Sequence, residues 1–503
     1  MELDLVVVQG HMARIRTVMS SSPSRMVAIV SICALHLIAL AGNNHASALA
    51  VRANHRLQIY GKRSSPAAAP PSSLSLRMAS DGTGSGSDDG VDKLTMVDSL
   101  PAFSTKRTVE AFFTTFQSTL AAAPCTSDNM RIFLHRTRQH AQESLQSLRL
   151  PATKDEAWKF TKLNTLFSQN FIAAPVQTSS SREYIKSRVL QCIDEQCRES
   201  YVVFVDGVFD ETLSHVKTEL LGGATVTSLS SLQGDLQQVE RLLLQMGVPA
   251  GGLALNKVPD VGEISRNSFG SDVLSSVNSA GLQDALLVRV PEGARPQAPL
   301  QVVFYSSADT ATFPKALIRS EKGSEFIFKQ SYISEEKVAG ADSGASSRSG
   351  LVCGRTEFKV DSGARVTHTY VQELGEDTKI VDVVSSDVYS GASFDTSIIQ
   401  VGAMLSRVNL HVNLKEERCN TTVNGITLAN AKQSIDLHSS ILHDAEACVS
   451  RQQQRNLIGN AGEGIFKGRI RIPKHAQVRS HVSSSDYPLT CFLLSPTLHS
   501  AGV

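Results

Sequence analysis

The sequence predicts a mostly β protein with a helical N-terminal domain, and three patterns indicate this fold class. In residues 408–479, apolar residues such as Val408, Leu410 and Val412 alternate with polar ones, as a strand with one buried face requires. These bursts recur about every 10 to 15 residues without an amphipathic helix between them. Nearer the N-terminus, apolar residues recur at helical spacing until Pro151.

Turn-forming residues separate the bursts, and we expect positive φ angles at these points: Asn424-Gly425, Asn460, Gly462, Gly464 and Lys467-Gly468. The isoleucines of the bursts, Ile426, Ile435 and Ile470, are expected to point into the core. Spacing alone leaves a β-sandwich and a β-solenoid equally open. The β pattern extends from about Leu286 to Arg479, and such length built from short units favours stacked coils.

Residues 1–99 have the composition of a targeting segment and a linker. Basic residues precede an apolar run at 26–41, which ends near the small residues Ala46, Ser47 and Ala48, as in a secretory signal with its cleavage region. The run is too short for a membrane span and contains His36. Residues 51–80 are basic, rich in serine and free of acidic residues, which is typical of a transit peptide. The alternative is a plain secretory signal followed by a disordered spacer.

A Gly/Ser/Asp-rich linker at 80–91 separates this segment from the folded part, which we expect to begin near Leu100. Two helices are predicted next, at 109–122 and from Asp128 to the residues before Pro151. Further along, the low-complexity stretch 338–350 is expected to be a disordered loop.

Composition limits the function classes. The chain has 503 residues, 41% of them hydrophobic, which is enough for a large core and about two domains. A net charge of +1 argues against a nucleic-acid-binding surface or a strongly acidic partner. The eight cysteines include no CxxC pair, so we expect reduced thiols. A metal site at Cys192 and Cys197 would need two further ligands.

No motif for nucleotide binding or for zinc or serine hydrolysis occurs in the chain. His438 and His443 could be read as a metal pair, but buried structural histidines are the favoured interpretation. A β-helix polysaccharide lyase or hydrolase is the alternative from another class, and it would need paired carboxylates. Asp436 stands without an obvious partner.

One motif series resembles the signature of the SufB/SufD family. It comprises Asp436, His438, His443 and Ser450, followed by a segment that contains Phe466 and Gly468 and then by Ala476-Gln477. The resemblance implies a right-handed parallel β-helix and a role as a scaffold of the SUF iron–sulfur cluster assembly machinery. It also implies that these motif positions lie at a partner interface and that none is catalytic.

A second motif, Pro151 to Thr161 with the single tryptophan Trp158, resembles a segment that marks the SufD type within this family. On the residues alone, it is a linker that the tryptophan anchors by burial. The stretches 201–209, 269–280 and 286–299 also resemble family elements. We therefore expect a helical N-terminal domain with a small α/β part at 100–285, a β-helix at 286–479 and a divergent tail at 480–503.

The resemblance implies a non-enzymatic subunit that pairs with SufB-like and SufC-like proteins. It would bind no cofactor by itself, and an iron–sulfur cluster would form only transiently at a complex interface. The signal-plus-transit segment resembles that of algae with secondary plastids, so we expect the plastid stroma, with no membrane association of the mature form. The family's Cys-x-His-Gly-Ala element and terminal helices have no match after Gln477, so an inactive truncated SufD product is a further alternative.

Overall fold

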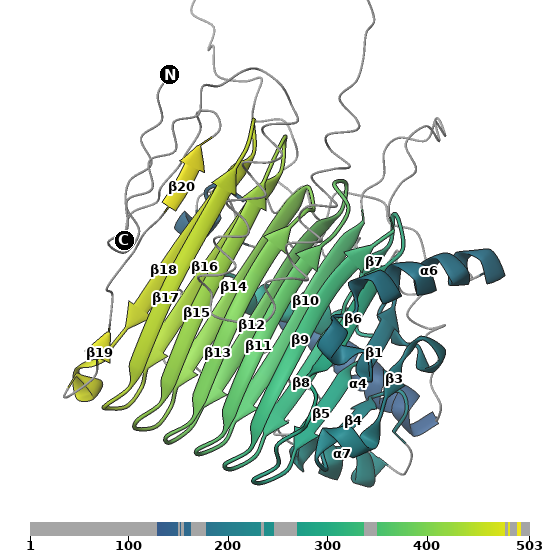
Figure 1. Cartoon of the computed structure of the whole chain (residues 1–503), viewed down its shortest axis with the longest axis horizontal. Coiled ribbons are helices and arrows are strands. Elements are labelled where there is room, and N and C mark those ends of the chain that lie inside the picture. Colours follow the sequence, from purple (N-terminus) through teal and green to yellow (C-terminus); the bar gives the residue numbers. More distant parts are fainter. Residues whose placement is uncertain are drawn as a thin grey trace, which may run out of the picture. The chain divides into compact units, whose positions relative to one another are not determined.

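The computed structural model describes residues 128–148, 151, 155–161, 178–232, 236–245, 269–335, 350–477, 481–482 and 490–493. Within them, two long parallel sheets form a solenoid, and helices flank its first coils (Figure 1). The predictions for residues 1–99, for the helix at 109–122 and for the loop after Val338 fall outside the described residues. None of the described helices is long and apolar enough to cross a membrane.

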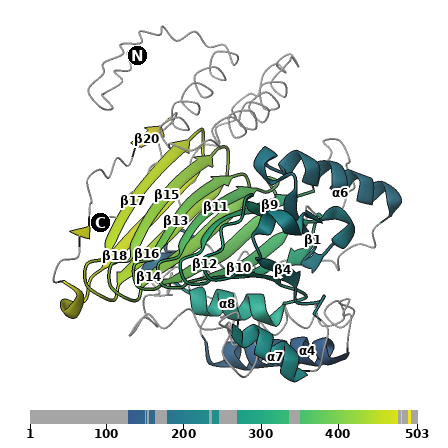
Figure 2. The ribbon, with the colours of Figure 1, turned by 60° about the horizontal axis from the view of Figure 1, so that its bottom comes forward.

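The described α-helices are α4 (Asp128–Ser147), α6 (Ser179–Cys192), α7 (Leu236–Gln245) and α8 (Ser271–Ala280). Short 3-10 helices span Glu156–Trp158, Glu195–Cys197, Glu211–Leu213, Thr218–Leu221 and Lys474–Ala476. The helix predicted from Asp128 to the residues before Pro151 is confirmed by α4. Helix α8 packs on one sheet of the solenoid and against α4 (Figure 2), so the chain that precedes the solenoid covers that sheet.

Four short strands join this helical part to the solenoid. Strand β1 (Ser200–Val205) turns through Asp206 and Gly207, both at positive φ, into β2 (Val208–Phe209), and β3 (His215–Val216) pairs with β1. Strand β1 also pairs in parallel with the first strand of one solenoid sheet, and β4 (Thr225–Ser228) pairs antiparallel with that of the other. The two sheets therefore begin before the solenoid itself.

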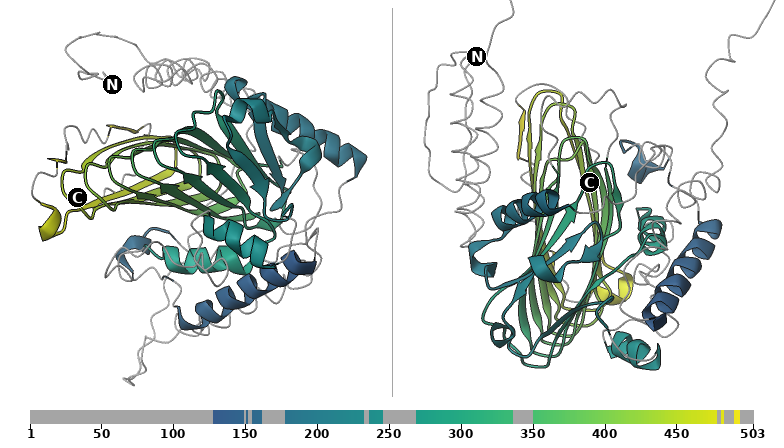
Figure 3. Two further views of the ribbon diagram at one scale, coloured as in Figure 1. Left: turned by 90° about the horizontal axis from the view of Figure 1, so that it is seen from below. Right: turned by 90° about the vertical axis from the view of Figure 1, so that its right-hand side faces the viewer.

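The solenoid is built from strands that alternate between two parallel sheets, so that each strand pairs with the preceding and the following strand of its own sheet. One sheet contains β6 (Leu300–Ser306), β9 (Glu325–Ser334), β11 (Arg365–Glu373), β13 (Ser393–Val401), β15 (Asn420–Ala429) and β17 (Val449–Ile458). The other contains β5 (Leu286–Val290), β8 (Lys315–Ser320), β10 (Leu351–Val360), β12 (Lys379–Val388), β14 (Leu405–Leu414), β16 (Ser434–His443) and β18 (Glu463–Arg471), and β7 (Ala311–Thr312) pairs with β10. The two views of Figure 3 show the coils stacked in chain order. This topology decides between the two architectures left open by the sequence: the protein is a parallel β-helix.

Aromatic and aliphatic side chains fill the interior of the first coils. The rings of Phe328, Phe358 and Phe394 contact one another from coil to coil, within a cluster of fully buried valines, leucines and isoleucines. Burial of this apolar surface is the main stabilising term for such a solenoid.

The interior becomes more polar in the later coils. On β15 the buried side alternates through Val423, Gly425 and Thr427. The prediction that Ile426 points inward is therefore wrong, since it lies on the opposite, half-exposed face. Ile435 is buried and Ile470 packs partly buried against the core, so both confirm the prediction.

Backbone turns stack between coils. A residue with positive φ precedes each of β9, β11, β13, β15 and β17, and these residues are Gly323, Gly363, Gly391, Arg418 and Ala447. Asn460 has positive φ in the turn before β18, as predicted. Asn424-Gly425, Gly464 and Lys467-Gly468 were expected in turns, which is wrong, because they lie inside β15 and β18. At Gly425 a Cβ atom would lie 1.6 Å from Gln454 Oε1, so this glycine permits close packing.

Two short strands follow the last full coil. Both β19 (His481–Val482) and β20 (Thr490–Leu493) pair in parallel with β17. Parts of the segment 480–503, which we expected to be a divergent tail, therefore extend the sheet that contains β17.

Candidate functional site

A row of polar side chains lies along the outer side of β14. Arg407, Asn409 and His411 alternate with Val408, Leu410 and Val412, which point into the solenoid. The whole strand is nevertheless buried, because the chain that precedes the solenoid covers this face. The polar row therefore lies between two layers of protein, where each polar group needs a partner.

Arg407 joins these layers. Its side chain is fully buried, and its Nη1 donates to the backbone carbonyl of Ala157 at 2.7 Å and to Asp436 Oδ2 at 2.8 Å. The guanidinium group stacks 3.7 Å from the ring centroid of Trp158. A desolvated cation on an indole face contributes about 2 kcal/mol or more, so Arg407 holds the 3-10 helix Glu156–Trp158 on the solenoid.

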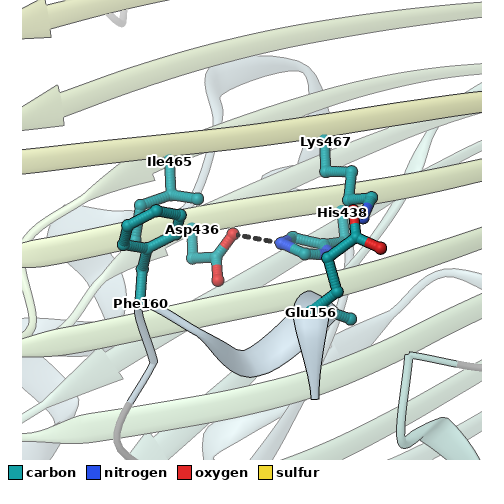
Figure 4. Close-up of a pocket in the computed structure, with 7 residues that line it drawn as sticks. Glu156, Phe160, Asp436, His438, Ile465 and Lys467 are labelled. Atoms are coloured by element: carbon teal, nitrogen blue, oxygen red, sulfur yellow. Dashed lines mark hydrogen bonds and ion pairs between the residues drawn. The ribbon is translucent and has the colours of Figure 1, made fainter. Parts of the chain in front are cut away.

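Asp436 and His438 complete this network from the neighbouring strand β16 (Figure 4). Thr161 Oγ1 donates to Asp436 Oδ2 at 2.6 Å, and His438 Nε2 lies 2.9 Å from Asp436 Oδ1. Arg407 Nη2 lies 3.2 Å from His438 Nδ1. Because arginine is only a donor, Nδ1 must accept, and the ring proton is placed on Nε2, facing the carboxylate.

The titration of this network follows from its burial. Burial lowers the pKa of His438 below its usual value, although Asp436 opposes the effect. For Asp436, burial alone would raise the pKa, but His438 and Arg407 together bring it below the usual value. The arrangement is therefore a carboxylate held between an arginine and a neutral histidine. The partner that the sequence failed to offer Asp436 was a second carboxylate, and the side chains that contact Asp436 are instead those of Arg407, Thr161 and His438.

A small pocket opens beside this network. Glu156, Phe160, Ile465 and Lys467 line it together with Asp436 and His438, and it has room for a water-sized group only. Lys467 Nζ donates to Glu156 Oε1 at 2.6 Å, and this contact lowers the pKa of Glu156. A sugar ring does not fit such a space, and both carboxylates of the pocket are already paired.

Trp158 is almost completely buried, which confirms that it anchors its segment. Its Nε1 donates to the carbonyl oxygen of Phe269 at 2.9 Å. The motif from Pro151 to Thr161 and the Asp436–His438 motif thus meet in one clamp, which we call the Arg407 clamp: Ala157, Trp158, Thr161, Arg407, Asp436 and His438. Sequence reasoning missed Arg407, although the polar residues at every second position of β14 were a signal.

The other motif residues lie elsewhere, because the strand pleat separates them from Asp436 and His438. His443 Nε2 and Ser450 Oγ are 2.9 Å apart, and both residues are fully buried. On β18, Phe466 packs partly buried against the solenoid core, while Gly468 is exposed. The six motif positions therefore do not form one site, and only Phe466 and Gly468 reach the surface.

Metal-binding groups are scarce in the part of the chain that the structure describes. It contains no cluster of three or more His, Cys, Asp or Glu side chains suited to a metal ion. Cys192 and Cys197 are both buried, and burial raises the pKa of Cys197 to about 12. A metal ligand must be a thiolate, so this thiol is poorly suited to the role.

Comparison with protein families gives two adjoining matches. Residues 112–302 match the SufBD protein N-terminal region, and residues 303–486 match the SUF system FeS cluster assembly SufBD core domain. The boundary between them falls within β6.

Curated relatives agree with these matches. An iron–sulfur cluster assembly SufBD family protein of Synechocystis is 24% identical, over 68% of this chain and 70% of that protein. Protein ABCI7, chloroplastic, of Arabidopsis thaliana is 23% identical, over 72% and 69%. The iron–sulfur cluster assembly protein SufD of Escherichia coli is 23% identical, over 68% and 70%. With both family regions matched in order on a parallel β-helix, the chain belongs to the SufB/SufD family of iron–sulfur cluster assembly scaffold proteins.

Proposed function

We propose that this protein is the SufD-type subunit of a plastid SUF complex and acts with a SufB-like scaffold and a SufC-like ATPase. The single observation that carries this proposal is the Arg407 clamp, in which the tryptophan segment that resembles the SufD type docks on the solenoid through Arg407 and Asp436. The SufD relative of Escherichia coli supports the same assignment.

The role is that of a non-enzymatic scaffold. The described carboxylates beside the pocket are engaged with Arg407 and Lys467, so neither is free for the acid–base chemistry that the polysaccharide lyase or hydrolase alternative requires. The secretory-type signal is the only feature that favours this alternative. The chain would bind no cofactor by itself, and a cluster would be built only at the interface with the SufB-like partner. Iron and sulfide added anaerobically to the purified chain should produce no absorption bands of an iron–sulfur cluster. A stable cluster on the isolated chain would contradict the proposal that it binds no cofactor by itself.

Partner binding is tested by purifying the tagged full-length chain from the cells that produce it. SufB-like and SufC-like chains should co-purify at near-equal amounts. The matched control is the same chain without residues 1–99, which should stay outside the plastid and capture neither. Absence of both partners from the plastid-localised sample would refute the proposed complex.

The location is proposed as the stroma of a secondary plastid, on the composition of residues 1–80 and the chloroplastic relative. A fluorescent reporter fused after residue 99 should accumulate in the plastid. Deletion of residues 51–80 should stop it before the stroma, and deletion of residues 1–50 should leave it in the cytosol. A reporter secreted by the intact segment would support the plain secretory signal instead.

A further inference from the structure

A second buried polar layer lies between α8 and the solenoid, away from the Arg407 clamp. Three serines of α8, Ser271, Ser275 and Ser279, are spaced four residues apart and so share one helix face. Ser271 Oγ lies 2.8 Å from His411 Nε2 on β14, and Lys315 Nζ on β8 donates to Ser279 Oγ at 2.7 Å. Helix α8 therefore crosses the sheet from β14 to β8, with Ser275 between the two contacts.

Arg355 occupies the corresponding middle position on the sheet. It lies on β10, is fully buried, and is the direct register neighbour of Lys315. Its Nε donates to Glu357 Oε1 at 3.0 Å. Its Nη1 and Nη2 have no hydrogen-bond partner among the described residues, and neither does Ser275 Oγ. An unpaired buried guanidinium end is costly, and it needs an explanation such as an ion or a water molecule.

The side chains of Arg355, Lys315 and Ser275 favour an ion over a water molecule at this position. The two unpaired guanidinium nitrogens of Arg355 are donors only, whereas the Ser275 hydroxyl can donate or accept. A water molecule would find only Ser275 Oγ among these unpaired groups as an acceptor for its two protons, whereas an anion accepts from all of them. Arg355 and Lys315 are also like charges on adjacent strands, which repel in a buried layer. Burial lowers the pKa of Lys315 to about 7, although the carboxylate of Glu357 opposes this effect, and the charge of Arg355 adds to the lowering. A negative ion beside Arg355 and Lys315 would offset the repulsion that Glu357 leaves.

We propose that Arg355, Lys315 and Ser275 bind a monatomic inorganic anion of chloride size between α8 and the solenoid. All three side chains are at most 1% exposed, so the proposed ion would be enclosed by protein. The bound anion would help to fix α8 on the sheet. This site is independent of the proposed complex, because it involves none of the family-motif residues.

The direct test is a crystal of the full chain grown or soaked in bromide, with anomalous scattering as the readout. An anomalous peak within hydrogen-bonding distance of Arg355 Nη1 or Nη2 supports the site. A water molecule with no anomalous signal at that position overturns it.

Thermal unfolding gives a second test, with sodium chloride and sodium gluconate compared at equal ionic strength. The wild-type protein should melt at a higher temperature in chloride. Ser275→Ala should raise the chloride concentration needed for half of this effect by about tenfold, since one hydrogen bond to a charged group is lost. Arg355→Met should abolish the difference.

The matched control is Arg319→Met on β8, because Arg319 is already paired with Asp361 at 2.9 Å. It should keep the full chloride effect. An equal chloride effect in the wild type and in Ser275→Ala would overturn the proposal, even if Arg355→Met fails to fold.

Discussion

Replacement of Arg407 by methionine tests the clamp that holds the N-terminal segment on the solenoid. The variant leaves Asp436 buried with a neutral histidine and Thr161 as its partners, and leaves the carbonyl of Ala157 without its donor. Removing one partner of a buried ion pair costs about 3–5 kcal/mol of folding stability. We expect a loss of that size in the free energy of unfolding at pH 7.

The assay is denaturant unfolding followed by tryptophan fluorescence. The chain has one tryptophan, and that residue stacks on Arg407, so the signal reports the clamp itself. A double variant, Arg407→Met with Asp436→Leu, should recover much of the loss because it removes both charges. The control is Arg451→Met on the exposed side of β17, which should change stability by less than about 0.5 kcal/mol.

The stabilisation that Arg407 provides through Asp436 should decrease as the pH falls. The pKa of Asp436 is lowered in the folded protein, so its pairing stabilises the fold above the pKa of the unfolded chain, about 4, and is lost as the pH falls through the folded value. The difference in the free energy of unfolding between the wild type and Arg407→Met should therefore become smaller at acidic pH. Equal stability of Arg407→Met and Arg451→Met at pH 7 would refute the clamp.

Three further predictions concern the solenoid. Ala447→Gly should stabilise the protein by about 0.5–1 kcal/mol, because Ala447 has a φ of 56° at a turn position where earlier coils have glycine. The control is Ala461→Gly, in an exposed turn without positive φ. A gain of the same size in the control would show that relief of the positive φ is not the cause. Gly425→Ala should cost about 1–3 kcal/mol, because the new methyl group would overlap Gln454 Oε1; adding Gln454→Ala should restore much of the loss, and no rescue would show that another contact is responsible. Burial raises the pKa of Asp382 to about 6, so the wild type should lose stability as the pH rises from about 4 to 6, where the unfolded chain is already ionised. Asp382→Asn should remove this loss, which is worth up to about 3 kcal/mol. The denaturant midpoint is measured against pH for the wild type and for Asp382→Asn, and an equal pH dependence in the two proteins would contradict the raised pKa of Asp382.

The apolar alternation of the sequence predicts strands where the solenoid interior is apolar. Val408, Leu410 and Val412 follow that rule and are buried. The rule fails at β15, where Val423, Gly425 and Thr427 face inward and Ile426 faces outward. There the interior is filled by polar side chains such as Gln454, which donates to Thr427, so apolar character no longer marks the inner face.

The clamp could be predicted only in part. Trp158 was identifiable because a lone tryptophan in a linker gains stability by burial. Arg407 was not, because its partners Ala157 and Asp436 lie on opposite sides of it in the chain, and the first is 250 residues away. An arginine in a strand normally indicates an exposed face, and only the covering N-terminal segment makes this one buried.

The proposed role of this protein is iron–sulfur cluster assembly in the plastid. The most direct measurement is depletion of the protein in the cells that produce it, followed by electron paramagnetic resonance of isolated plastids reduced with dithionite. After depletion, the iron–sulfur signals should fall while the plastid iron content is maintained, and a wild-type copy should restore them. Unchanged cluster signals after complete depletion would contradict it.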